Sequence, residues 1–235
     1  MRGLVRVGAA VPSLALGNVK ENMKRHLAMM REAKEKHVSI VTFPELSLTG
    51  YTCGDLFFQR RLLDDVTDAL LALKDEMPEE ILAVVGAPLE IEGALYNCAV
   101  VLHKGEIISA VPKTFLPNNG EFYEKRWFQS GDARRDASVA IPKLKTDVCR
   151  QAIFETEDSV RFGIELCEDL WAPLPPSTML SVEGAEIILN LSASNELLSK
   201  REYRQQLISQ QSARCQCGYC LLYTSDAADE GLGVD

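Results

Sequence analysis

The sequence predicts an α/β domain in which β-sheets pack face to face and helices cover their outer sides. Short apolar runs with the pattern of buried strands alternate along the chain with stretches whose apolar residues recur at helical spacing. The 235 residues, of which 46% are hydrophobic, are enough for one domain with a complete core. We therefore expect a single domain.

The first half of the chain begins with a Val-rich strand pattern that is followed by an amphipathic helix. Asn18 is placed to cap this helix, in which Met23, Leu27 and Met30 recur at helical spacing with charged residues between them. Further along, Lys104-Gly105 indicates a short hairpin between two strands. The expected elements are strands at residues 4–10, 40–43, 81–88, 96–103 and 106–111 and helices at 19–37 and 59–76.

The second half contains a long stretch without a clean period. Residues 117–135 are polar with interspersed Gly and aromatic residues, so we expect a long surface loop, and loops of this length in compact domains usually serve a function. The acidic, small-residue segment 224–235 is expected to be a disordered or non-native tail. The remaining expected elements are strands at 152–154, 160–166, 186–191 and 219–223 and helices at 177–183 and 200–213.

The charge and hydropathy of the chain exclude several classes of partner. The formal net charge of -9 argues against nucleic acid or an anionic membrane, because either would be repelled over most of the protein. No window approaches eighteen uninterrupted apolar residues, and Met1-Arg2-Gly3-Leu4 leads into a strand pattern without the apolar region of a signal peptide. We expect a cytoplasmic protein that acts on small metabolites.

The seven cysteines are expected to be free thiols. Their number is odd and no secretory signal accompanies them, which argues against a disulfide framework. Cys215-Gln216-Cys217-Gly218-Tyr219-Cys220 has a spacing typical of metal sites. A zinc site needs four ligands, however, and the three histidines are scattered along the chain, so no metal site is expected.

Three expected strands end directly before a residue that is capable of catalysis. Pro44-Glu45 follows one strand, Pro112-Lys113 follows a second, and Cys167 follows a third. Each has a simpler explanation when taken alone: a Glu or Lys after a strand is usually a solvated loop residue, and a free cysteine is usually a small buried hydrophobe. Because strand ends of an α/β layer can converge on one cleft, the three together predict an active site.

The chemistry of this trio is consistent with amide or nitrile hydrolysis. A thiol is only a few per cent ionised at neutral pH, so it needs a base or a positive neighbour, and Glu45 and Lys113 would supply one of each. Lys113 and the backbone N–H of Glu168 would stabilise a tetrahedral oxyanion on the substrate. The expected intermediate is an acyl-enzyme on Cys167, and the reaction needs no metal or other cofactor.

The three motifs also resemble those of a known superfamily. Phe43-Pro44-Glu45, Val111-Pro112-Lys113 and Glu165-Leu166-Cys167-Glu168-Asp169 are similar to the Glu, Lys and Cys motifs of the nitrilase (carbon–nitrogen hydrolase) superfamily, in the same chain order. From about Val5 to Tyr219 the chain resembles most closely the glutaminase domains of glutamine-dependent NAD synthetases. The strings that carry this closer resemblance are residues 43–57, 121–128, 173–177 and 190–195.

The resemblance implies a four-layer αββα sandwich that hydrolyses the side-chain amide of L-glutamine. Ammonia would then reach a synthetase domain that amidates deamido-NAD, and ATP and Mg²⁺ would be needed for that second reaction alone. The resemblance also implies a homo-oligomer. The implied catalytic residues are Glu45, Lys113 and Cys167, and the implied substrate-binding positions are Asn119, Glu124, Glu168, Ser194 and Lys200, of which Glu124 would also orient Lys113.

Departures from the family pattern keep other functions open. The resemblance stops after Cys220, so we expect a glutaminase domain over residues 1–223 that is incomplete at its C-terminal end, with the synthetase domain absent. A stand-alone amidase or nitrilase acting on another small amide is the second candidate. A non-catalytic, oligomerising scaffold that keeps the same fold is the third.

Overall fold

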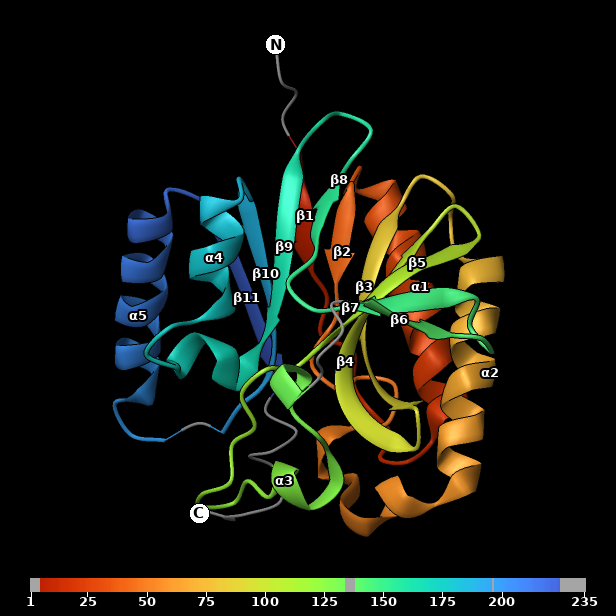
Figure 1. The fold of residues 1–235 in the computed structure, drawn as a ribbon. Coiled ribbons are helices and arrows are strands. Elements are labelled where there is room, and N and C mark those ends of the chain that lie inside the picture. The colour runs from red at the N-terminus through yellow and green to blue at the C-terminus, as the bar shows by residue number, and fades with distance from the viewer. Residues whose placement is uncertain (1–4, 134–137, 196, 225–235) are drawn as a thin grey trace.

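The computed structural model describes residues 5–133, 138–195 and 197–224. Their strands form two β-sheets that lie face to face, with helices on both outer sides (Figure 1). The layers follow one another as helix, sheet, sheet and helix. This confirms the αββα sandwich expected from the sequence.

The larger sheet has seven strands in the order β1-β2-β3-β4-β5-β7-β6. β1, β2 and β3 run parallel, whereas β3, β4 and β5 form an antiparallel meander. β3 turns into β4 at Glu92-Gly93, where both residues have positive φ, as a tight hairpin turn requires. The strands are β1 (Val7–Ala9), β2 (Ile40–Thr42), β3 (Leu82–Ile91), β4 (Ala94–His103), β5 (Glu106–Pro112), β6 (Ser138–Ile141) and β7 (Thr146–Cys149).

The smaller sheet has four strands in the order β11-β10-β9-β8. β9, β10 and β11 are parallel, so the chain must cross over between them, and it does so through the outer helices α4 (Pro176–Val182) and α5 (Lys200–Cys215). β8 runs antiparallel to β9 at the edge. The strands are β8 (Ile153–Glu155), β9 (Arg161–Leu166), β10 (Ile187–Ala193) and β11 (Gly218–Thr224).

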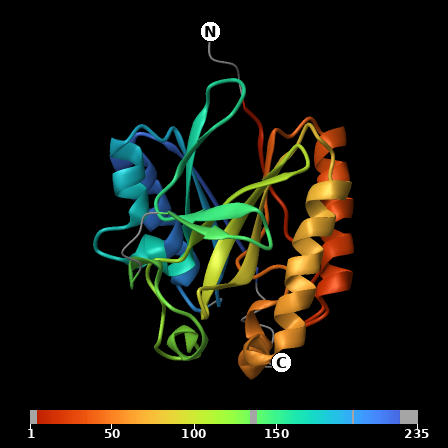
Figure 2. The ribbon, with the colours of Figure 1, turned by 45° about the vertical axis from the view of Figure 1, so that its right-hand side comes forward.

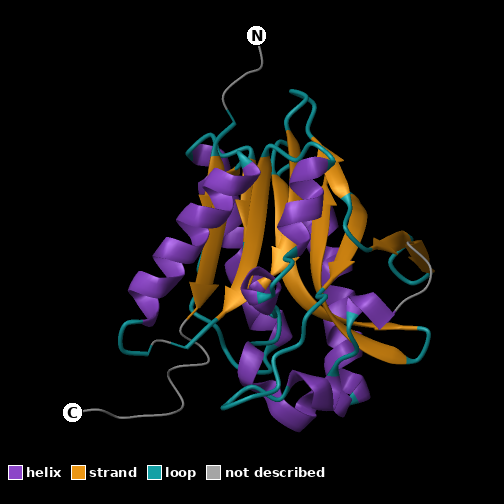
Figure 3. Ribbon diagram, turned by 60° about the vertical axis from the view of Figure 1, so that its left-hand side comes forward, coloured by secondary structure: helices purple, strands orange, loops and turns teal. Residues whose placement is uncertain are grey.

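The outer helices lie on opposite sides of the molecule. α1 (Val19–Glu35) and α2 (Arg60–Glu76) cover the larger sheet, while α4 and α5 cover the smaller one (Figure 2). Figure 3 shows the strands of both sheets between these helices. No helix in the described part of the chain is long and apolar enough to cross a membrane.

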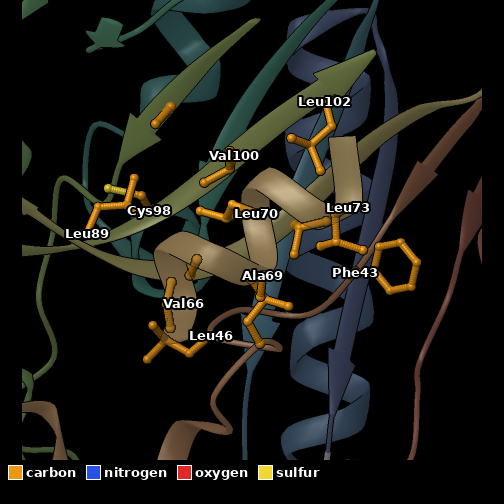
Figure 4. Close-up of a cluster of buried hydrophobic side chains, with 14 of the residues drawn as sticks. Phe43, Leu46, Val66, Ala69, Leu70, Leu73, Leu89, Cys98, Val100 and Leu102 are labelled. Atoms are coloured by element: carbon orange, nitrogen blue, oxygen red, sulfur yellow. The ribbon is translucent and has the colours of Figure 1, made fainter. Parts of the chain in front are cut away.

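A buried stripe on α2 anchors the chain around Glu45. Val66, Leu70 and Leu73 recur at helical spacing, and all three are fully buried. Figure 4 shows them packed together with Phe43 and Leu46 in one cluster. Full burial of one such side chain stabilises the fold by about 1.5–3 kcal/mol. Because Phe43 and Leu46 flank Glu45, this core fixes the loop that carries it.

A second core lies between the two sheets. Ile40, Val84 and Val101 of the larger sheet pack against Ile164 and Leu189 of the smaller one. These residues alternate with side chains that point toward the helices, as the period of two in a strand requires. The packing brings the ends of β2, β5 and β9 close together.

The structure corrects some of the expected elements. The segment 117–135 is not a surface loop throughout, because it contains the short helix α3 (Glu124–Trp127), whose Glu124 is buried, and the turn η2 (Gly131–Ala133). Such short elements show no period in the sequence. The 3₁₀ turns η1 (Tyr51–Phe58) and η3 (Cys167–Trp171) and the β6–β7 hairpin were not expected either. Thr224 ends β11, and the rest of the expected tail, 225–235, lies outside the described residues.

Helix α1 holds the segment that follows Glu45. His26 is fully buried, with Nδ1 2.7 Å from the Asn22 carbonyl oxygen and Nε2 2.9 Å from Ser47 Oγ. The carbonyl can only accept, so Nδ1 carries the proton and the Ser47 hydroxyl donates to Nε2. Burial lowers the pKa of His26 from 6.5 to about 4, although its hydrogen bond to Asn22 opposes this change.

We expect this histidine to make the fold sensitive to acid. Unfolded His26 binds a proton near pH 6.5 and folded His26 only near pH 4, so the free energy of unfolding decreases as pH falls through this window. The loss by pH 4.5 is about 2–3 kcal/mol. Urea unfolding at pH 7 and pH 4.5 should show a smaller decrease in His26→Gln, and equal decreases in the two proteins would contradict the assignment.

Candidate active site

The three strand ends singled out in the sequence meet at one edge of the sandwich. The Lys113 ammonium at the end of β5 lies 2.6 Å from Glu45 Oε1 and 2.5 Å from Glu124 Oε1. Glu45 follows β2, and Cys167 follows β9 directly. The side chains of Lys113 and Glu45 have no exposed surface, and Cys167 is 7% exposed. The charges of Glu45, Lys113 and Glu124 all act on the Cys167 thiol.

Glu45 is fixed from three sides. Its Oε1 accepts from the amide of Asn97 on β4 at 2.7 Å, and its Oε2 accepts from the backbone N–H of Ala193 at the end of β10 at 2.9 Å. The third support is Gly86 on β3, which has no side chain and lets the backbone of residues 44–46 approach. A Cβ at this position would lie 2.3 Å from the Pro44 carbonyl oxygen.

Lys113 is placed by the backbone on both sides of it. Its N–H donates to the Asn97 carbonyl at 2.8 Å, and its carbonyl accepts from the N–H of Gly131 at 2.8 Å. The buried carboxylate of Asp169 then accepts from the backbone N–H of Phe115 at 2.7 Å and from that of Leu166 at 3.0 Å. Asp169 therefore ties the chain after Lys113 to the chain before Cys167.

Cys167 lies at a sharp turn between β9 and η3. Its φ of 44° is in the left-handed region, which a cysteine adopts only where the surrounding structure holds it. The Leu166 N–H donates to Asp169, and this bond closes the turn. The sulfur lies 3.8 Å from the Ala193 carbonyl oxygen, so the thiol is next to the same strand end that holds Glu45.

One buried cation faces two buried carboxylates at this site. Burial alone would lower the pKa of Lys113, but the charges of Glu124 and Glu45 outweigh it and hold this pKa well above its ordinary value. Burial raises the pKa of Glu124 to about 7, against the attraction of Lys113 and with the repulsion of Glu45. Lys113 is therefore charged at neutral pH, whereas Glu124 titrates near pH 7.

The thiol is protonated in the resting site. Burial raises the pKa of Cys167 far above its ordinary value, and the negative charge of Glu45 adds to this increase, while Lys113 opposes it. A free thiolate therefore does not accumulate. Attack by the sulfur requires a group beside it that takes the proton as the new bond forms.

The other expected site residues differ in their placement. Glu124 is part of the buried cluster, and its Oε1 also accepts from the Tyr51 hydroxyl at 2.7 Å. Glu168 is half-buried, and burial raises its pKa. Ser194 is buried, with its hydroxyl 3.3 Å from the guanidinium of Arg204. Asn119 has an exposed side chain, and no described contact joins that side chain to the cluster.

Lys200 connects two segments that are distant in the sequence. Its ammonium lies 5.9 Å from the centre of the Phe122 ring and 5.7 Å from that of the Trp171 ring, and it donates to the side chain of Asn195. Phe122 belongs to the segment 117–135, and Trp171 ends η3. The segment 117–135 and the end of η3 therefore meet at the Lys200 ammonium.

Several residues of the site have no clear signal in the sequence. Tyr51, Asn97 and Asp169 contact the cluster or its backbone, but a tyrosine after a turn and an asparagine inside an apolar strand fit many structures. The one available signal is that Asn97 interrupts the apolar run of β4. A buried polar side chain at such a position needs partners, and here its partners are the two carboxylates.

A cavity of about 430 Å³ lies beside the cluster. Thr114 and Glu168, which follow Lys113 and Cys167 directly, are part of its lining together with Trp171 and Lys125. A second cavity of about 420 Å³ is lined by Phe57 and Trp127 among others. Glu45, Lys113 and Cys167 line neither cavity, but only the first is lined by their direct neighbours Thr114 and Glu168. Among the described residues, no group of three or more His, Cys, Asp or Glu side chains could hold a metal ion.

Comparison with known proteins agrees with this geometry. The carbon–nitrogen hydrolase family matches residues 6–231, which is nearly the whole chain. The chain belongs to this family. The carbon–nitrogen hydrolase fold therefore accounts for both sheets and for the three converging strand ends.

The curated relatives that match this chain include glutamine-dependent NAD(+) synthetases. Glutamine-dependent NAD(+) synthetase from Mycobacterium bovis is 37% identical over 220 residues, which cover 92% of this chain and 32% of the relative. The Homo sapiens enzyme is 30% identical over 196 residues, which cover 80% of this chain and 28% of the relative. This carbon–nitrogen hydrolase thus spans about a third of the length of the curated relatives it matches.

Among solved structures, the glutamine-dependent NAD(+) synthetase from Cytophaga hutchinsonii has a TM-score of 0.81 at 29% identity, covering 92% of this chain and 35% of that chain. An amidase from Nesterenkonia sp. has a TM-score of 0.72 at 14% identity, covering 95% of this chain and 79% of that chain. The second likeness shows a shared fold alone.

We expect Gly86→Ala to disturb the segment that carries Glu45. The added Cβ would meet backbone atoms at 2.3 Å and 2.4 Å, which cannot move without displacing that segment, so a loss of about 1–3 kcal/mol or more is expected. Gly8→Ala on β1 is the matched control, because its Cβ would meet only the side chain of Val38. Thermal unfolding at equal temperatures in the two variants would contradict the close approach.

Proposed function

We propose that this chain is the glutamine-hydrolysing part of a glutamine-dependent NAD synthetase. The observation that carries the proposal is the Lys113 ammonium, which lies between the carboxylates of Glu45 and Glu124 beside the Cys167 thiol. The 30–37% identity to such synthetases over most of the chain supports glutamine as the source of the amide. The ammonia would serve the ATP-dependent amidation of deamido-NAD by a synthetase domain.

In the acylation step, Glu45 takes the proton of the Cys167 thiol while the sulfur attacks the carboxamide carbon of glutamine. The carbonyl oxygen becomes an oxyanion, which the Lys113 ammonium and the backbone N–H of Glu168 stabilise. Glu45 then gives its proton to the leaving nitrogen. The C–N bond breaks, ammonia leaves, and a thioester joins the glutamyl group to Cys167.

In the deacylation step, Glu45 takes a proton from water, and the resulting hydroxide attacks the thioester carbon. The C–S bond breaks and glutamate is released. The sulfur recovers its proton from Glu45, so the enzyme returns to its starting state. Neither step uses a metal or an organic cofactor, and ATP and Mg²⁺ belong to the separate synthetase reaction.

Substrate recognition involves charged and polar groups near Cys167, of which Glu168 lines the cavity. Lys200 pairs with the substrate carboxylate as a point charge, without the two-pronged geometry that an arginine would give. Glu168, Ser194 and Asn119 complete the proposed contacts with glutamine, and Glu124 keeps the Lys113 ammonium in place. Assembly into a homo-oligomer stays a prediction.

Replacing the nucleophile tests this function directly. We expect Cys167→Ala to lower glutamate release from glutamine by at least about 1000-fold, because the variant lacks the sulfur that attacks the amide beside Glu45 and Lys113, while the circular dichroism spectrum stays unchanged. Cys220→Ala is the matched control and should retain turnover. Retained turnover in Cys167→Ala would eliminate the mechanism. Faster release from asparagine or simple amides than from glutamine would favour a stand-alone amidase.

The pKa of Glu124 predicts an acid limit for catalysis. Below about pH 7 its carboxylate takes up a proton and holds the Lys113 ammonium less firmly, so kcat should fall as pH decreases, approaching tenfold per pH unit. The limit should be absent from the much slower Glu124→Gln variant. A wild-type profile that is flat from pH 7 to pH 5 would contradict this role.

A further inference from the structure

Behind the proposed nucleophile lies a buried carboxylate that the mechanism above does not use. Glu165 is 1% exposed and points from β9 toward the outer helices. It accepts from the backbone N–H of Ser177 at the start of α4 at 2.8 Å and from the Tyr219 hydroxyl of β11. Burying a charged group is costly unless it is hydrogen-bonded, so we examined which groups Glu165 holds in place.

The register of two parallel strands aligns this carboxylate with the cysteine. Glu165 pairs with Asn190 across β9 and β10, and Leu166 pairs with Leu191. The next residues along the two strands are Cys167 and Ser192. Cys167 itself lies at the turn that ends β9, and its sulfur is 3.8 Å from the carbonyl oxygen of Ala193, the residue that follows Ser192. Ser192 and Asn190 are two residues apart on β10, so their side chains point to the same face of the sheet.

Hydrogen bonds connect the side chains of Glu165, Asn190 and Ser192 in a row. The Asn190 amide nitrogen donates to Glu165 at 3.4 Å and to the Tyr219 oxygen at 3.1 Å, which turns Asn190 Oδ1 toward Ser192. The Ser192 hydroxyl lies 2.8 Å from that Oδ1, and it acts on the neighbouring Cys167 thiol, whose pKa it lowers. Glu165, Asn190 and Ser192 are all nearly or fully buried.

We propose that Ser192 is a positioning residue for the Cys167 thiol, and that Asn190, held by Glu165 and Tyr219, orients its hydroxyl. This inference rests on the proposed function, in which Cys167 is the nucleophile. Ser192 acts on the sulfur from β10 of the smaller sheet, whereas Glu45 and Lys113 extend from the larger sheet. It therefore supports the thiolate without adding charge.

The hydroxyl changes its partner as the thiol ionises. In the resting site Ser192 donates its single proton to Asn190 Oδ1, and its oxygen can accept the thiol proton. When Glu45 removes the thiol proton, the Ser192 hydroxyl turns and donates to the thiolate. The proton moves from sulfur to Glu45, and Ser192 keeps its own proton throughout.

The rate of Cys167 alkylation by iodoacetamide, followed across pH by peptide mass spectrometry, measures thiolate formation without turnover. We expect Ser192→Ala to lower this rate about tenfold at pH 8 and to move the pH midpoint upward, as for one lost hydrogen bond to an ionised group. It should also lower kcat and leave KM unchanged. Glu45, Lys113, Glu124 and Tyr51 also face this thiol, and none of them is altered in the variant.

Matched variants separate this role from a loss of packing. Ser109→Ala removes another buried serine hydroxyl, which donates to the Asp147 carbonyl far from the site, and should leave alkylation unchanged. Ser192→Thr and Ser192→Val have the same shape but differ in the hydroxyl, so Thr should alkylate faster than Val even if Ser192→Ala does not fold. Equal alkylation of the Thr and Val variants would overturn the proposal.

A double-mutant cycle tests the contribution of Asn190. The effects of Ser192→Ala and Asn190→Ala on the logarithm of the alkylation rate should not add, because Asn190 acts through the serine. Additive effects would overturn the orienting role. If Cys167→Ala abolishes turnover and Ser192→Ala alkylates normally, the positioning role fails while the proposed function stands. Retained turnover in Cys167→Ala would overturn the proposed function. Alkylation of the Ser192 variants would then still show by itself whether Ser192 positions the thiol.

Discussion

The ammonium of Lys113, enclosed between the carboxylates of Glu45 and Glu124, is the contact on which the site depends. Removing such charges from water costs several kcal/mol for each ion, and only close pairing and further hydrogen bonds offset this cost. Asn97 and the Ala193 N–H supply those bonds to Glu45. Because one cation faces two carboxylates, negative charge is in excess. Burial raises the pKa of Glu124 and of the Cys167 thiol, and this excess of negative charge adds to both increases.

The charged site of Glu45, Lys113 and Glu124 meets the Cys167 thiol only when the two sheets are packed together. Glu45 and Lys113 extend from the larger sheet, whereas Cys167 and the Ala193 N–H belong to the smaller one. The apolar contact between the sheets therefore determines the distances on which the chemistry depends. Asp169 adds a direct link, because its carboxylate bonds the backbone next to Cys167 and the backbone after Lys113. Packing and catalysis thus share one set of contacts, and a shift between the sheets would change both.

Much of the site could be predicted from local patterns. The strands that precede Glu45, Lys113 and Cys167 are short apolar runs, and each ends at a proline or at a carboxylate-flanked cysteine. Glu124 could be placed near Lys113 only through the resemblance to a known superfamily. The expectation of an open surface loop around it was wrong, because α3 has four residues and shows no helical period. Its position depends on contacts such as the bond between Tyr51 and Glu124, which joins residues 73 apart.

The sequence by itself determined the order of the longer strands and helices and the three residues at the strand ends, because strand periodicity and proline stops are local properties of the chain. It did not indicate α3, the 3₁₀ turns or the β6–β7 hairpin. The tertiary structure decided which of these ends meet, which carboxylates share one ammonium, and which serine lies beside the sulfur. Those contacts depend on the register between β9 and β10 and on the packing of two sheets. Register and packing are set by side chains that are distant in sequence, and no local pattern records them.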